Sequence, residues 1–144
     1  MKRYRLSPQA RDAVAAYRPG LAPAAARAVF VTGTGPDLVL RAAGAAAMAL
    51  GRHVLVRRAL VRAGPSSHVL PARLVVHELA HVAQFAVGGA ALFLAGYLAA
   101  YVRGLRGLRS VHREAAYRAI PAEVLARQAE AGLEWPEAFR VEPL

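Results

Sequence analysis

Two histidines and a glutamate in the middle of the chain have the spacing of a zinc site. His77, Glu78 and His81 form a His-Glu-x-x-His sequence. Side chains at positions i and i+4 of a helix lie one above the other, so His77 and His81 can offer two imidazole nitrogens to one Zn2+ ion. Glu78 lies beside them and can take a proton from water whose pKa zinc lowers from about 16 to about 7. This pattern predicts peptide-bond hydrolysis with Glu78 as general base.

A catalytic zinc site usually has three protein ligands, so one more is required. The chain has no cysteine, and the third ligand must therefore be a histidine or a carboxylate. Downstream candidates are His112, Glu114 and Glu123. The first two lie in an arginine-rich segment that is also typical of a solvated helix face. Glu123 follows Pro121 in the first turn of an expected helix, where the helix dipole alone favours a carboxylate. Spacing alone does not decide which of the three residues is the third ligand.

An accidental pair of histidines is the alternative to a metal site. In a chain of 144 residues with 5 His, a chance match to the pattern has a probability of about 1%. Histidine and glutamate on an apolar helix are also costly to bury without partners, which a zinc ion would supply. We therefore expect a metal site.

Helices are expected to carry these residues. Apolar side chains recur with helical spacing from residue 70 up to Gly88-Gly89, a second apolar helix is expected over residues 90–105, and a last one from Ala122 to about Ala131. The second half of the chain is thus predicted to be all helical.

The first half is predicted to form a small sheet with helices. Ser7-Pro8 is an N-cap followed by proline, which predicts a helix over Pro8–Tyr17. Runs rich in β-branched residues predict strands over residues 28–32 and 53–62, whereas residues 38–50 are ambiguous. Early strands and late helices predict a single α+β domain over residues 1–144.

The formal net charge is +10 and is unevenly distributed. Residues 1–64 hold 11 basic and 2 acidic side chains, whereas residues 123–144 hold 2 basic and 5 acidic ones. Such a field favours anionic partners, but the chain has no nucleic-acid motif, and we expect no specific nucleic-acid recognition. Contact of the arginine-rich face, Arg103 to Arg118, with a membrane surface or an acidic partner is an open alternative.

The block from Val76 to Gln84, the apolar helix with Tyr97 and Tyr101, and the segment 116–127 resemble small gluzincin-type zinc metallopeptidases. They are also similar to the metallopeptidase-like domain associated with extracellular contractile injection systems. The resemblance covers residues 70–131 and implies a zincin-like fold. It also implies that Glu123 is the third zinc ligand. Gluzincins often carry an acidic residue shortly after that ligand, whereas Arg127 stands four positions on in this chain.

Residues 82–102 form an apolar run of membrane-spanning length. The resemblance implies a buried helix of the zincin scaffold instead, and Gly88-Gly89 divides the run into pieces too short to span. At the amino terminus, polar residues follow Met1 to Arg5 where the apolar core of a signal peptide would begin. We therefore expect no secretory signal and a cytoplasmic location.

Hydrolysis also requires a donor for the developing oxyanion and a surface that aligns the substrate. Tyr117, six residues before Glu123, is the first candidate for the donor, and His112 is the second. The substrate is expected to be a peptide or protein extended along an edge strand, for which residues 53–62 are the candidate.

Two other interpretations compete with the zinc metallopeptidase. The chain could be a catalytically inactive zinc-binding scaffold or interaction module. It could instead be a basic membrane-surface or nucleic-acid-binding protein in which the histidine pair is incidental.

Overall fold

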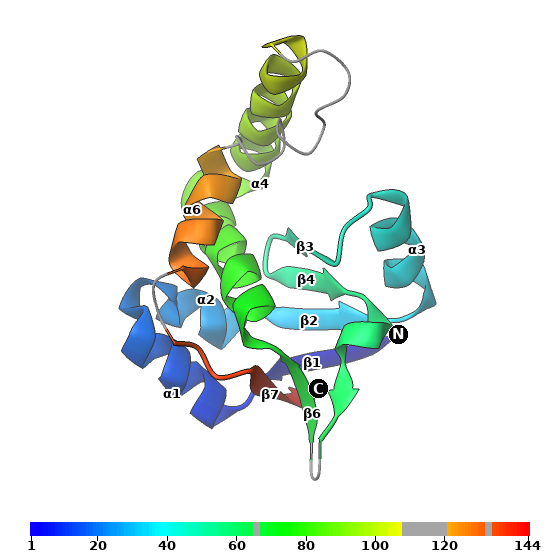
Figure 1. The fold of residues 1–144 in the computed structure, drawn as a ribbon, viewed down its shortest axis with the longest axis vertical. Coiled ribbons are helices and arrows are strands. Elements are labelled where there is room, and N and C mark those ends of the chain that lie inside the picture. The colour runs from blue at the N-terminus through cyan, green and yellow to red at the C-terminus, as the bar shows by residue number, and fades with distance from the viewer. Residues whose placement is uncertain (65–66, 108–120, 132–133) are drawn as a thin grey trace.

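Seven strands form one mixed sheet in the computed structural model, which describes residues 1–64, 67–107, 121–131 and 134–144 (Figure 1). Their order across the sheet is β3-β4-β2-β1-β7-β6-β5. Only β2 and β4 are parallel among the described pairs, and the other neighbours are antiparallel. The strands are β1 (Lys2–Leu6), β2 (Val29–Thr32), β3 (Ala47–Leu50), β4 (His53–Val56), β5 (Arg62–Ala63), β6 (His68–Pro71) and β7 (Ala138–Pro143).

Helices accompany this sheet and confirm the α+β class. They are α1 (Pro8–Tyr17), α2 (Ala22–Arg27), α3 (Thr34–Ala42), α4 (Ala72–Gly107) and α6 (Pro121–Glu130), with short 3-10 helices η1 (Pro19–Leu21) and η2 (Arg58–Leu60). Helix α1 has the predicted bounds and the predicted cap, because the Ser7 hydroxyl accepts a hydrogen bond from the Ala10 N–H at 3.2 Å.

The two ends of the chain pair with each other, so the expectation of an all-helical second half is wrong. Strand β7 lies between β1 and β6, and Arg5 faces Glu142 across the β1/β7 pair. Phe139 and Val141 are buried while Arg140 is exposed, which is the period-2 pattern of a strand with one covered face. A segment this short becomes a strand because the sheet provides a partner on each side.

The predicted strand over residues 53–62 ends early, at Val56. Asp37 of α3 accepts hydrogen bonds from the Arg58 backbone N–H at 2.9 Å and from its Nε at 2.7 Å. These bonds hold the chain in the short helix η2 and end the strand. Strand β4 is also internal, since β3 and β5 form the two edges of the described sheet.

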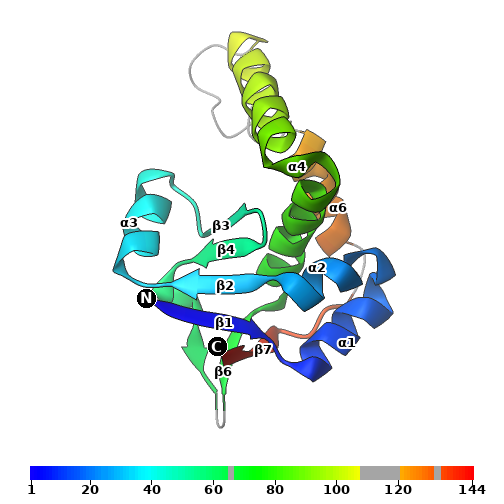
Figure 2. The same cartoon turned by 180° about the vertical axis from the view of Figure 1, so that it is seen from behind.

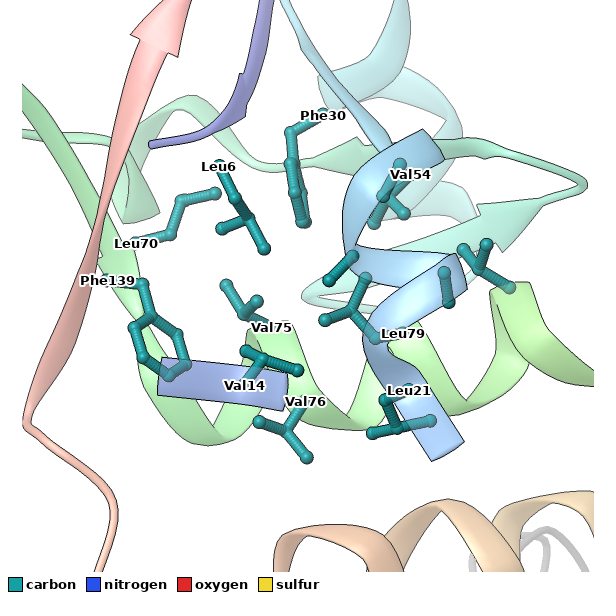
Figure 3. Packing of buried hydrophobic residues seen from close by; sticks show 14 of the residues in the cluster. Leu6, Val14, Leu21, Phe30, Val54, Leu70, Val75, Val76, Leu79 and Phe139 are labelled. Atoms are coloured by element: carbon teal, nitrogen blue, oxygen red, sulfur yellow. The ribbon is translucent and has the colours of Figure 1, made fainter. Parts of the chain in front are cut away.

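The hydrophobic core places α4 on the sheet (Figure 3). Val75, Val76 and Leu79 of α4 are fully buried and lie against side chains from α1, η1 and the strands. The labelled partners are Leu6, Val14, Leu21, Phe30, Val54, Leu70 and Phe139. Because the apolar side of α4 is fixed in this way, the orientation of its polar residues is fixed as well.

Helix α4 continues beyond the sheet, and α6 lies beside it (Figures 1 and 2). Gly89 interrupts α4 with the non-helical angles φ 71° and ψ 158°, at the expected division of the apolar run. Among the described residues, none of the helices contains a stretch whose length and hydropathy would let it span a bilayer.

Candidate metal centre

Three of the predicted ligands meet between α4 and α6. His77 and His81 lie one turn apart on α4, and Glu123 lies in the first turn of α6. The structure confirms that these residues are close enough to hold one metal ion. Among the described residues they form a group that could hold a metal ion, and they are the three residues that the resemblance implied.

The donor atoms of the three side chains all lie within 4.8 Å of one another, which is close enough to share one ion. His77 Nε2 and His81 Nε2 are 3.2 Å apart. The Glu123 carboxylate places Oε2 3.2 Å from His77 Nε2 and Oε1 3.3 Å from His81 Nε2. Tetrahedral ligands about 2.0–2.1 Å from zinc are about 3.3–3.4 Å apart, and two histidines with one glutamate are a donor set of catalytic zinc. The residues therefore fit the ion that the sequence predicts.

Glu78 is buried on the side of α4 that faces the edge strand β3. Its side chain is removed from water, and its Oε2 has no hydrogen-bond partner among the described residues. Desolvation raises the pKa of Glu78 from 4.5 to about 7, against the opposing effects of His81, His77 and the Ala49 backbone N–H. A carboxyl group with a pKa near 7 is suited to exchange protons at neutral pH.

His81 is held by partners on two sides. Burial opposes its charged form, but hydrogen bonds with Glu123 and Gln84 outweigh burial and raise its pKa. The contact with Gln84 joins His81 Nδ1 to Gln84 Oε1 at 2.9 Å.

A carboxylate also approaches the outer nitrogen of His77. Glu130 Oε1 is 3.8 Å from His77 Nδ1, which is within ion-pair range and longer than a hydrogen bond. Arg127, which stands where gluzincins often have an acidic residue, instead lies 4.0 Å from Glu123 Oε2. The acidic side chain near His77 is thus Glu130, which lies one turn of α6 beyond Arg127. Sequence reasoning missed Glu130, although its spacing of seven from Glu123 places both on one face of a helix.

Three sequence candidates lie outside the described residues. Tyr117, the predicted oxyanion donor, falls in residues 108–120 together with His112 and Glu114. Their roles stay predictions.

The edge strand beside the site is β3, and the prediction of residues 53–62 for this position is wrong. Arg57 N–H donates to the Ala46 carbonyl at 3.2 Å, and hydrogen-bonded pairs alternate along an antiparallel ladder. The N–H and C=O groups of Ala47 and Ala49 consequently point to the free edge. The Ala49 N–H reaches the Glu78 carboxylate there.

Comparison with known families identifies this chain. The model of the eCIS core domain matches residues 12–89, which is more than half of the 144 residues. The chain therefore belongs to the eCIS core domain family, which links it to extracellular contractile injection systems. The matched region contains the His-Glu-x-x-His sequence but ends before Glu123. Neither the curated proteins nor the solved structures include a match.

The pKa of Glu78 predicts how stability depends on pH in the chelated chain. The folded-state pKa of about 7 lies above the ordinary 4.5, so the folded state binds more protons than the unfolded state between these values. Stability is then lost as pH rises from 4.5 to 7, by about 3 kcal/mol at about 1.4 kcal/mol per pH unit. The raised pKa of His81 acts in the same direction.

Glu78→Gln separates the contribution of Glu78 to this pH dependence from that of His81, because glutamine does not titrate. The free energy of unfolding can be measured in urea with EDTA present. Between pH 4.5 and 7, the original chain should lose up to about 3 kcal/mol of this free energy relative to the variant. A difference between the two proteins that is constant across this range would contradict the raised pKa.

Proposed function

We propose that this chain is a zinc-dependent peptidase in which His77, His81 and Glu123 hold the metal. The observation that carries the proposal is the position of Glu78, a buried carboxyl group with a pKa of about 7, directly beside the three metal-ligating residues. Bound zinc supplies acidified water and polarises a carbonyl group.

Glu78 would act as general base and then as general acid. Its carboxylate would accept a proton from the attacking water and afterwards donate it to the leaving amine. Burial favours its neutral form while the neighbouring His81 and His77 favour its charged form, so both protonation states are accessible near pH 7. General acid–base catalysis of this kind contributes about 10²–10⁴-fold to a rate.

The free edge of β3 would align the substrate. Ala47 has outward N–H and C=O groups, and an extended peptide can add to such an edge as a further strand. Because the neighbouring Ala49 reaches Glu78, a peptide on this edge would lie close to the proposed base. A peptide or protein is therefore the substrate class that we propose.

A peptide-library digestion with the full chain tests the proposal. We expect cleavage by the zinc-loaded protein, none after treatment with EDTA, and recovery when zinc is restored. Mass spectrometry of the products would give the cleavage sites, and metal analysis of each sample would give the zinc content.

Other outcomes would favour the competing functions. Stoichiometric zinc without cleavage of any peptide, combined with a lower thermal midpoint after chelation, would contradict the peptidase and favour a zinc-stabilised interaction module. Salt-sensitive binding to nucleic acid or anionic vesicles that His81→Ala leaves unchanged, in a chain that binds no zinc, would favour a basic surface protein.

A further inference from the structure

Gln84 connects the two helices that carry the metal-ligating residues. It lies three positions after His81 on α4, and its Oε1 is 2.9 Å from His81 Nδ1. Its Nε2 donates a hydrogen bond to the Ala122 carbonyl at 3.2 Å, across 38 positions of sequence. Ala122 immediately precedes Glu123. One half-buried amide therefore contacts a ligand on α4 and the backbone next to a ligand on α6.

The chemistry of these groups determines where the protons are. A backbone carbonyl only accepts hydrogen bonds, so the NH₂ end of the Gln84 amide must face Ala122. The oxygen end then faces His81, and because that oxygen is also an acceptor, His81 Nδ1 must carry a proton. In the charged imidazole the second proton lies on His81 Nε2 and faces the Glu123 carboxylate, and loss of that proton leaves a neutral ring with a lone pair on Nε2. That nitrogen is the atom 3.3 Å from Glu123 Oε1.

We propose that Gln84 is a positioning residue that prepares the metal centre before an ion arrives. It keeps His81 in the tautomer whose Nε2 can bind a metal, and it holds the first turn of α6 so that Glu123 stays in reach. The proposal rests on the metal site of the proposed function, but it does not require that the chain cleaves peptides.

The opposite end of α6 is held in a different way, which provides a useful contrast. Arg18 donates to the carbonyls of Ala129, Gln128 and Ala131 at 3.0, 3.2 and 3.0 Å. These bonds fix the position of the helix without touching a metal-ligating side chain. A variant at Arg18 can therefore disturb helix placement while it leaves the tautomer of His81 alone.

The test compares four variants of the full chain with the original. Gln84→Met removes both contacts at similar size, whereas Gln84→Glu keeps the acceptor for His81 and removes the donor to Ala122. Gln128→Met is the matched control, because the Gln128 side chain is exposed on α6. Arg18→Met loosens α6 at its other end.

The first readout is the position of the imidazole proton, from histidine ¹⁵N chemical shifts of the chelated chain above pH 8. We expect Nδ1–H for His81 in the original chain, the Gln128 control and Arg18→Met. Gln84→Met should give a mixture of tautomers, and Gln84→Glu should retain the proton on Nδ1.

The second readout is the zinc dissociation constant, measured by competition with a chromophoric chelator. Gln84→Met should bind zinc about 10–100-fold more weakly than the original chain, as for other groups that orient metal-ligating histidines. Gln84→Glu should bind more tightly than Gln84→Met, and Gln128→Met should match the original.

Either of two results with a folded Gln84→Met protein would overturn the proposal. One is a Gln84→Met protein with the original tautomer and the original zinc affinity. The other is an equal loss of affinity in Gln84→Met and Gln128→Met. If Gln84→Met does not fold, the tautomer of the original chain and of Gln84→Glu decides the question, since Nε2–H in either contradicts it. An original chain that binds no zinc removes the proposed function and this proposal together, whereas zinc binding without cleavage removes only the former.

Discussion

Replacing Glu78 with glutamine is expected to lower the rate of peptide cleavage by about 10²–10⁴-fold, which is the usual contribution of a general base. Glutamine has nearly the same shape as glutamate but cannot accept the proton from water. The loss should appear in kcat/KM, measured on a peptide that the original chain cleaves. Zinc content should stay unchanged, because the residues proposed to hold the metal are His77, His81 and Glu123.

The control for this change is Glu134→Gln, which makes the same substitution at an exposed residue. It should leave both cleavage and zinc content as they are. Unchanged cleavage by Glu78→Gln would exclude Glu78 as the base. Loss of zinc together with cleavage would assign Glu78 to the support of the metal centre instead of proton transfer.

Glu123→Ala is expected to weaken zinc binding by more than about 100-fold, because even residues that only orient a ligand account for about 10–100-fold. The substitution removes the carboxylate whose two oxygens lie 3.2 and 3.3 Å from the histidine nitrogens. At a zinc concentration one hundred times its Kd, the original chain should gain about 2.7 kcal/mol of stability from binding. The variant should gain almost none of this, and thermal unfolding with and without zinc would measure the difference.

Two further variants decide which carboxylate is the ligand. Glu134→Ala is a matched change at an exposed glutamate, and Glu114→Ala tests the competing third ligand that spacing left open. Both should keep about one zinc per chain in metal analysis by mass spectrometry. If Glu123→Ala kept its zinc and Glu114→Ala lost it, Glu123 would be refuted as the third ligand.

Features that depend on neighbours in the sequence were predictable. The spacing of His77 and His81 places them on one helix face, and the Ser7 cap determines where α1 begins. Both follow from interactions within a turn or two of helix. The α+β class also followed, since runs of β-branched residues and helical periodicity are local patterns.

Strand pairing was much harder to predict from the sequence. Strands β1 and β7 were not predicted, and the expected edge strand over residues 53–62 is replaced by β3 beside the site. The physical reason is that a short strand gains its stability from partners that lie far away along the chain. Charged, exposed residues alternate with buried ones from Arg3 to Leu6, but only pairing with β2 and β7 makes this segment a strand.

The sequence by itself determined the chemistry that is available: two histidines and a glutamate on one helix, and no cysteine to compete for a metal. Only the tertiary structure brought Glu123 to the histidines, Glu130 to the far side of His77, and Gln84 across to Ala122. Helix geometry relates residues a few positions apart, whereas α6 reaches the site through the packing of α4 on the sheet and the bonds at both ends of α6. Local spacing could therefore name the candidate ligands on α4, but the position of the residues on α6 depended on the fold of the whole domain.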